Sequence, residues 1–149
     1  MAHLPTHRGF KKFTGFLTGR QSFRSSTRWR DDAPLNDTTY ATNLYGHDTL
    51  ATLDVHDPEL PLFLYLPWQT PHSPYDSVPD WGWDRGTNYE GMLWITDCYV
   101  GLLRTMLVAK GMYDNTLIVY SSDVRISTRA LVVPTRRPLT SPSHPPILI

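Results

Sequence analysis

The fold is decided by the stretch Pro61-Leu62-Phe63-Leu64-Tyr65-Leu66-Pro67. Five apolar or aromatic residues stand between two prolines, so neither face of this segment is polar. A strand that is apolar on both faces is typical of a parallel sheet that is covered on both sides. We therefore expect a buried strand at residues 62–66. A loop should follow over residues 67–87, which hold four prolines and two glycines.

A long helix is expected after this loop. From Asn88 to Lys110, apolar residues recur at three- and four-residue steps, which is the spacing of one helix face. Lys110 complements the negative end of the helix dipole, and Gly111 suits the position that ends a helix. A shorter helix is expected within residues 40–57, whereas residues 1–40 should hold loops and short elements.

A second buried strand is expected at residues 116–120, which read Thr-Leu-Ile-Val-Tyr. Strand, loop, helix and strand make a βαβ unit, whose two strands are parallel and joined by a right-handed crossover. The predicted fold class is therefore α/β, with a parallel sheet, one clear βαβ unit and long loops.

Two polar residues follow the ends of these strands. Ligands of parallel sheets gather beyond the carboxyl ends of the strands, so His72 and Asp123 could face one crevice. His72 lies between two prolines and could donate a proton or hydrogen bond to an anion; the alternative is a surface-loop histidine. Asp123 could ligate a hard cation; the alternative is a helix N-cap or turn residue.

Composition excludes several classes of protein. The chain has 149 residues, with 14 basic and 14 acidic side chains, so its net charge suggests no polyanionic partner. The basic flanks, residues 1–30 and 124–149, carry no nucleic-acid-binding motif, and we expect no nucleic-acid partner. No apolar run reaches the length of a membrane span. Residues 124–149, rich in Pro, Ser and Arg, are expected to be disordered.

Cysteine and targeting signals are sparse. The single cysteine, Cys98, rules out an internal disulfide framework and is expected to be a small core residue. The first ten residues lack the apolar region of a signal peptide. Asn36 begins a formal N-glycosylation triplet, which has meaning only on a secreted chain.

The order of motifs resembles the sulfatase family, in particular enzymes of the arylsulfatase B type. Residues 61–66 and 69–74 are similar to the family's strand and histidine loop, and residues 92–97 and 111–123 to the helix and strand that follow. Residues 4–10 resemble the segment before its Phe-Gly loop. We therefore expect residues 1–123 to be a partial sulfatase domain, an internal fragment of the catalytic domain, and residues 124–149 to be a basic tail.

The resemblance implies a partial alkaline-phosphatase-like fold and hydrolysis of sulfate esters or sulfated glycans. Complete members are lysosomal or secreted, and they use a formylglycine nucleophile and a calcium ion. By this resemblance, His72 would contact the sulfate and help to expel the leaving group. Asp123 would be the aspartate of the family's Asp-Asn metal pair.

The departures from the family pattern concern the same chemistry. Val124 stands where the family has the asparagine of the metal pair, and the early paired aspartates are absent. Residues 17–20, Leu-Thr-Gly-Arg, match the closing half of the nucleophile signature, but the nucleophile position then falls on Gly9, so we interpret the match as chance. We expect this chain alone to bind calcium weakly and to have no sulfatase activity.

The alternative is a degenerate, non-catalytic module that binds a sulfated glycan or a protein partner. Trp68, Trp81 and Trp83 lie near His72 in the sequence and could stack on sugars. Packing within the loop is the other interpretation of these three residues.

Overall fold

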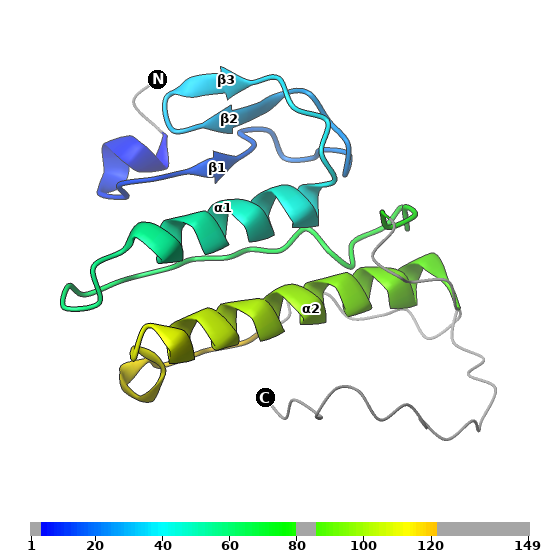
Figure 1. Cartoon of the computed structure of the whole chain (residues 1–149). Coiled ribbons are helices and arrows are strands. Elements are labelled where there is room, and N and C mark those ends of the chain that lie inside the picture. The colour runs from blue at the N-terminus through cyan, green and yellow to red at the C-terminus, as the bar shows by residue number, and fades with distance from the viewer. Residues whose placement is uncertain (1–3, 80–85, 122–149) are drawn as a thin grey trace. The chain divides into compact units, whose positions relative to one another are not determined.

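The computed structural model describes residues 4–79 and 86–121, drawn in colour in Figure 1. The chain divides into two compact units, Met1–Thr116 and Leu117–Ile149, and every described helix and strand belongs to the first. In chain order the elements are η1 (Pro5–Arg8), β1 (Thr14–Gly15), β2 (Arg28–Arg30), β3 (Ala33–Leu35), α1 (Ala41–Val55), α2 (Asn88–Ala109) and η2 (Tyr113–Asn115).

The three short strands form an antiparallel sheet in the order β1-β2-β3. The turn from β2 to β3 passes through Asp31, whose φ of 51° is positive, a conformation that aspartate tolerates better than most residues. The Asp31 carboxylate also accepts a hydrogen bond from the backbone N–H of Phe13 at 2.9 Å. Only short elements were predicted here, because strands of two or three residues are too short to show a period.

Both predicted helices are confirmed. α1 lies within the expected range, and α2 begins at the expected residue. Thr87 and Glu90 form a reciprocal capping box at the start of α2, which satisfies backbone donors that have no partner within the helix. At its other end, Lys110 is the C-cap and Gly111 has a φ of 68°, the left-handed conformation that ends many helices.

α1 and α2 run parallel to each other. Near their midpoints, Gly46 of α1 lies against the Tyr99 ring of α2. Beyond their C-terminal ends, the Lys110 ammonium donates a hydrogen bond to the carbonyl of Asp54 at 2.8 Å. The contacts therefore advance in the same direction along both helices, and the connecting chain returns to the start of α2 (Figure 1).

The core joins the start of α1, the first half of α2 and the loop before β2. Its buried members are Phe23, Tyr40, Ala41, Met92, Ile95 and Tyr99. Phe23 stacks on Tyr40 with ring centroids 5.4 Å apart, and Trp68 stacks on Tyr99 at 6.1 Å. Four rings that are distant in sequence therefore pack at one apolar centre.

The two expected strands are not present among the described residues. Residues 61–69 run back along α1 without strand pairing, and Phe63 and Tyr65 are 74% and 70% exposed (Figure 1). Residues 117–120, in the second unit, also form no strand, and Leu117 is 88% exposed. Neither run is a buried strand among the described residues, and the βαβ unit stays a prediction.

The physical reason is that an apolar run becomes a strand only when a neighbour pairs with its backbone. Within residues 4–79 and 86–121, the only sheet is the antiparallel one, which pairs neither run. The predicted loop is confirmed for its described residues, 67–79 and 86–87, which contain no helix or strand. The alkaline-phosphatase-like fold stays a prediction.

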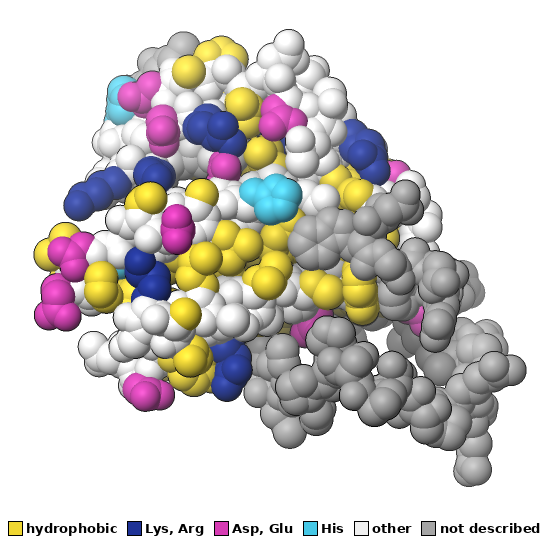
Figure 2. Space-filling view, viewed as in Figure 1, with side chains coloured by type: hydrophobic (Ala, Val, Ile, Leu, Met, Phe, Trp, Pro, Cys, Tyr) yellow, Lys and Arg dark blue, Asp and Glu magenta, His cyan; other side chains and the backbone are white. Residues whose placement is uncertain are grey.

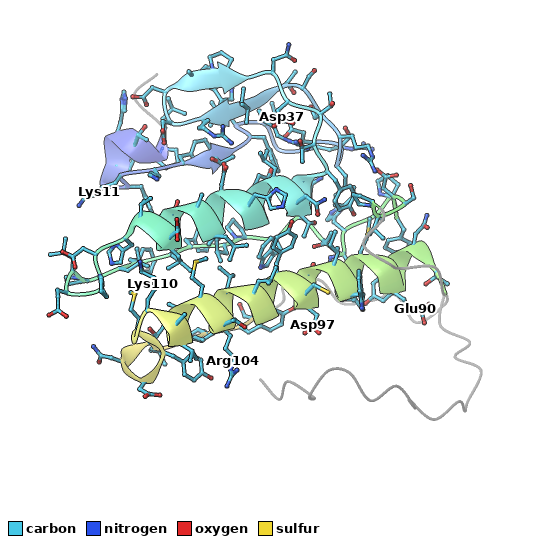
Figure 3. All side chains as sticks on the ribbon, in the orientation of Figure 1. Lys11, Asp37, Glu90, Asp97, Arg104 and Lys110 are labelled. Carbon is cyan, nitrogen blue, oxygen red and sulfur yellow. The ribbon has the colours of Figure 1, made fainter. Side chains whose placement is uncertain are left out.

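α2 is long and apolar enough, by length and composition, to cross a membrane. Met92, Ile95 and Tyr99 are fully buried in the protein core, however, while Asp97 and Arg104 are charged residues on the same helix (Figure 3). A core helix therefore accounts for the same apolar character, and the expected absence of a membrane span stays a prediction.

Hydrophobic side chains are also exposed. Figure 2 shows them gathered in a band over α1 and α2 on the viewed face. Leu102 and Val108 of α2 are 42% and 51% exposed. The described part of the chain therefore has exposed apolar side chains on α2 as well as in residues 62–66.

Candidate functional site

His72 lies on the loop of residues 69–76, between the two helices in sequence. Its backbone N–H donates a hydrogen bond to the carbonyl of Gln69 at 3.0 Å, which closes a tight turn. The imidazole Nδ1–H donates to the carbonyl of Ser73. Because a carbonyl can only accept, this bond places the proton of the neutral ring on Nδ1 and leaves Nε2 with a free lone pair.

A chain of buried hydroxyl groups anchors this loop to both helices. Thr70 is 7% exposed, and its hydroxyl pairs with that of Thr96 on α2 at 2.6 Å and with that of Thr42 on α1 at 3.4 Å. Thr96 in turn donates to the Met92 carbonyl at 2.9 Å. The backbone two residues before His72 is therefore held between α1 and α2.

The same loop is tied to the segment before β2. The Gln69 amide donates a hydrogen bond to the backbone carbonyl of Gln21 at 2.6 Å. Arg24 and Asp76 form a long ion pair, with 4.0 Å between nitrogen and oxygen. These two links connect residues that are about fifty positions apart in the sequence, so only the folded chain brings them together.

A cavity of about 310 Å³ lies between these two segments. It is lined by residues 16, 19–23, 69 and 72–76. The lining residues include His72 and Arg20, both of which are exposed, and the aromatic residues Phe16, Phe23 and Tyr75. The volume lies at the lower end of the range of small-ligand pockets, which is room for one sugar ring or a group of similar size.

Charge in this cavity is not balanced. The Asp76 carboxylate faces Arg24, and Arg24 also lies over the Tyr40 ring at 5.4 Å from its centroid. Burial, with the nearby Asp76 charge, raises the pKa of Tyr40, so this phenol stays neutral. The Arg20 side chain has no ion pair or hydrogen bond with any residue in the ranges 4–79 and 86–121. Arg20 is exposed, so water can solvate its charge.

Arg28 holds the backbone of Phe23, one of the lining residues, and was not singled out in the sequence. Its side chain is fully buried and donates hydrogen bonds to the carbonyls of Phe23, at 2.6 Å, and Thr39, at 2.5 Å. Desolvation by burial lowers the pKa of Arg28. No sequence pattern reveals a buried arginine of this kind. Its hydrogen-bond acceptors are backbone carbonyls, which every residue has.

Arg20 is a second residue to which the sequence assigned no role. It belongs to the Leu-Thr-Gly-Arg match at residues 17–20, which was interpreted as chance. The structure places Arg20 in the same cavity as His72. A basic residue beside a glycine in a loop was the available signal, but nothing in the sequence related it to a histidine fifty residues away.

The remaining predicted residues are not brought to this cavity. Asp123, with Val124, lies outside the described residues, as do Trp81 and Trp83. Trp68 is partly buried on Tyr99, which favours packing over sugar binding. Among residues 4–79 and 86–121, there is no group of three or more His, Cys, Asp or Glu residues that could hold a metal ion.

Asn36 and Cys98 complete the set of residues noted in the sequence. Asn36 is exposed directly after β3, and its glycosylation stays a prediction. Cys98 is partly exposed on α2, and burial together with the neighbouring Asp97 raises the pKa of its thiol. A raised pKa lowers the thiolate fraction, which is the opposite of what a nucleophilic cysteine needs.

Comparison with known proteins gives partial matches to sulfatases. The chain is 32% identical over 146 residues to arylsulfatase J of Mus musculus, covering 80% of this chain and 24% of the relative. It is 27% identical over 129 residues to the uncharacterized sulfatase YdeN of Escherichia coli (strain K12), covering 80% of this chain and 23% of that protein. No protein-family model matches, and no solved structure matches.

The chain thus spans about a quarter of the length of the curated relatives that it matches. These matches support the sulfatase family. They do not single out arylsulfatase B, since the two relatives are an arylsulfatase J and a bacterial sulfatase.

Proposed function

We propose that this chain is the histidine-bearing part of an arylsulfatase-type domain, whose reaction is the hydrolysis of sulfuric esters. The observation that carries the proposal is the similarity to two sulfatases over 80% of the chain. The resemblance to arylsulfatase B is the finer form of the proposal and rests on the motif order at residues 61–74 and 111–123.

His72 is proposed to contact the sulfate group and to assist the leaving group. His72 is an exposed residue in the lining of a cavity, so a substrate could reach it from solvent. Cleavage of the ester leaves an alkoxide, which is stabilised when a protonated imidazole gives it a proton. The bond from Nδ1 to Ser73 leaves Nε2 as the atom that would carry that proton.

The proposed α/β fold is supported by the arrangement of the helices. In α/β sheets, two consecutive helices run parallel because a strand between them leads the chain back to the start of the second helix. The same connection is present here, with residues 61–69 in the place of the strand. Their exposed apolar side chains are those that a covered strand would bury.

The calcium ion of complete family members has no complete set of ligands in this chain. Asp123 offers one carboxylate, and Val124 offers no side-chain oxygen, while a hard cation takes six or more oxygen ligands. The residues present do not fit a tightly bound calcium ion, and no step of the proposed reaction is derived through it. This chain also lacks the nucleophile signature, so we propose that it has no turnover alone.

A chimera tests this proposal. Residues 4–121 would replace the corresponding part of mouse arylsulfatase J, which keeps the rest of that protein unchanged. Hydrolysis of a chromogenic aryl sulfate by the chimera is expected, together with its loss on His72→Ala by about two orders of magnitude or more. The isolated chain should show no hydrolysis.

Two results would contradict the proposal. A folded chimera that hydrolyses the sulfate equally well with and without His72 would remove the role of this residue. Hydrolysis by the pure 149-residue chain would show that its own residues suffice.

The non-catalytic alternative is favoured by one observation, the cavity itself, because a module that only binds a sulfated glycan needs a cavity and no nucleophile. A folded chimera that binds a sulfated saccharide but shows no turnover would support this alternative.

A further inference from the structure

We propose that residues 62–66 form an antiparallel β-ladder with the same residues of a second copy of this chain, which gives a two-fold symmetric dimer. The segment reads Leu-Phe-Leu-Tyr-Leu and lies between Pro61 and Pro67. The inference goes beyond the proposed reaction and does not depend on it. It is carried by the free backbone of this segment, by its exposed rings and by the charges on either side of it.

The backbone of the segment is available for pairing. Residues 61–69 run back along α1 as an extended stretch without helix or strand (Figure 1). From residue 62 to residue 65, no backbone N–H or carbonyl has a hydrogen-bond partner within the ranges 4–79 and 86–121. A row of unpaired backbone groups is the template to which an added strand binds.

The two prolines fix the register of the ladder. In an antiparallel pair, alternate residues exchange both backbone hydrogen bonds with the residue opposite, and the residues between them turn these groups away. With Leu64 on the two-fold axis, the even-numbered residues make the bonds to the second copy. Pro61 and Pro67, which have no N–H, then fall at positions where none is needed.

Hydrogen bonds within the chain limit the ladder to the same five residues. On one side, the Leu60 carbonyl accepts a hydrogen bond from the His56 imidazole at 3.0 Å. On the other side, the backbone N–H of Trp68 donates to the Leu66 carbonyl at 2.9 Å. The next even-numbered residues in both directions are therefore already engaged.

The exposed rings of the segment gain partners in this register. Phe63 and Tyr65 are 74% and 70% exposed, whereas Leu62 and Leu66 are partly buried. An axis at Leu64 sets Phe63 of each copy opposite Tyr65 of the other, at the positions where opposite side chains lie closest. Aromatic cross-strand pairs stabilise a sheet, so the pairing covers the two rings that the single chain leaves in solvent.

Charge decides the direction of the pairing and favours a second copy as the occupant. Residues 60–68 have no charged side chain, but Asp57 and Glu59 come shortly before them. Parallel pairing in register would set each carboxylate against its own counterpart, which is unfavourable. The antiparallel register sets Glu59 opposite Gln69 and Asp57 opposite Pro71. It therefore brings no like charges together.

The other edge of the segment explains why pairing stops at two copies. That edge would use the odd-numbered residues, of which Pro61 and Pro67 have no N–H to donate. Only Phe63 and Tyr65 remain there, which is too short a stretch for a further strand. A two-fold contact between identical segments is closed, so the expected assembly is a dimer.

The test is sedimentation velocity of the full chain over a range of protein concentrations, in which a monomer–dimer equilibrium is expected. Leu64→Pro removes the N–H on the axis and should weaken the dimer about tenfold or more, because hydrogen bonds at the centre of the ladder are lost. In the single chain this N–H has no partner among the described residues. The urea midpoint, measured at a concentration too low for pairing, should therefore stay unchanged.

Leu102→Lys is the matched control. Leu102 is a 42% exposed apolar residue of α2, outside the segment. Its replacement should leave the dimer affinity within about twofold, as for a surface substitution away from the contact.

A charge exchange tests the register. Phe63→Lys combined with Tyr65→Glu sets each introduced lysine opposite an introduced glutamate in the antiparallel register. This double variant should pair more tightly than either single variant, and added salt should reduce the difference. In a parallel register the same double variant would set like charges opposite each other and should pair less tightly than both.

Four results would overturn the inference. They are a chain that stays monomeric at every concentration, a dimer that Leu64→Pro leaves intact, a dimer that Leu102→Lys weakens as much as Leu64→Pro does, and assemblies that keep growing beyond two copies. A double variant that pairs less tightly than both single variants would overturn the antiparallel direction. Hydrolysis by the chimera is a separate measurement, so the proposed function is tested independently of this inference.

Discussion

The backbone of Gly46 lies directly against the ring of Tyr99, and a methyl group at this glycine would overlap the Cδ1, Cε1 and Cγ atoms of the ring. Gly46 is in the middle of α1, where glycine usually costs about 1 kcal/mol relative to alanine. Its presence is explained by the close approach of α2. The ring is in turn stacked on Trp68, so it has little room to move away.

We therefore predict that Gly46→Ala destabilises the protein although alanine favours helices. Overlap in a packed core costs about 1–3 kcal/mol, which exceeds the gain in helix propensity. The measurement is the free energy of unfolding from urea denaturation. Gly19→Ala is the control, because nothing lies within 4 Å of a methyl group there. In a Tyr99→Ala background the loss at Gly46 should disappear; a gain in stability in the unchanged background would contradict the packing.

The hydroxyl chain that holds the histidine loop makes a second prediction. Thr70→Val should lower the free energy of unfolding by about 1–3 kcal/mol, because the fully buried hydroxyl of Thr42 then lacks its partner. Thr105→Val is a matched control, since its exposed hydroxyl bonds only the Gly101 carbonyl of its own helix. Equal effects of the two substitutions on the urea midpoint would show that the chain of hydroxyls contributes nothing.

The capping box of α2 predicts a dependence of stability on pH. Hydrogen bonds from Thr87 to the Glu90 carboxylate lower the pKa of Glu90 below its ordinary value of 4.5. A carboxyl group with a lowered pKa stabilises the fold above its unfolded value, and this contribution is lost as the pH falls through the lowered pKa. Glu90→Gln should therefore reduce both the stability at pH 7 and the further loss on acidification.

The check is the urea midpoint measured at several values between pH 7 and pH 3. Thr87→Ala removes the other half of the box and should cost about 1 kcal/mol. If the unchanged chain and Glu90→Gln gave identical pH profiles, the capping interaction would not be the source of the pH dependence of stability.

Cys98 is predicted to react slowly. Burial and the adjacent Asp97 raise the pKa of the thiol, so the thiolate fraction at pH 7 is smaller than that of an unperturbed cysteine. Alkylation by iodoacetamide, followed by mass spectrometry, should be slower than for free cysteine and should rise with pH over a higher range. Asp97→Asn should increase the rate slightly; a rate above that of free cysteine would contradict the raised pKa.

The apolar run before the histidine loop makes the last prediction. Tyr65 is 70% exposed, so Tyr65→Lys should change the free energy of unfolding by less than about 0.5 kcal/mol. Leu53→Ala, at a fully buried position of α1, should cost about 2–5 kcal/mol. If Tyr65→Lys were as costly as Leu53→Ala, residues 62–66 would be buried in this chain, as the sequence had predicted.

The helices were predictable because their signals are local. The three- and four-residue steps of Met92, Ile95 and Tyr99 lie within one segment, and Thr87 and Gly111 mark its ends. The strand structure of residues 62–66 and 116–120 could not be predicted reliably, because an apolar run indicates only that a segment can be buried. Whether Phe63 and Leu117 are covered depends on strands that pair with their backbone, which the described residues do not supply; the Phe63 ring contacts the Phe10 ring, with centroids 6.0 Å apart, and stays 74% exposed.

The sequence by itself predicted the two helices and the loop between them, and it showed a resemblance to sulfatases that pointed to His72. Only the tertiary structure placed Arg20 and His72 in the lining of one cavity, where a hydrogen bond joins Gln69 to Gln21 across about fifty residues. Helix periodicity and caps act over a few residues and can be read from the chain, whereas a cavity exists only where distant segments pack against each other.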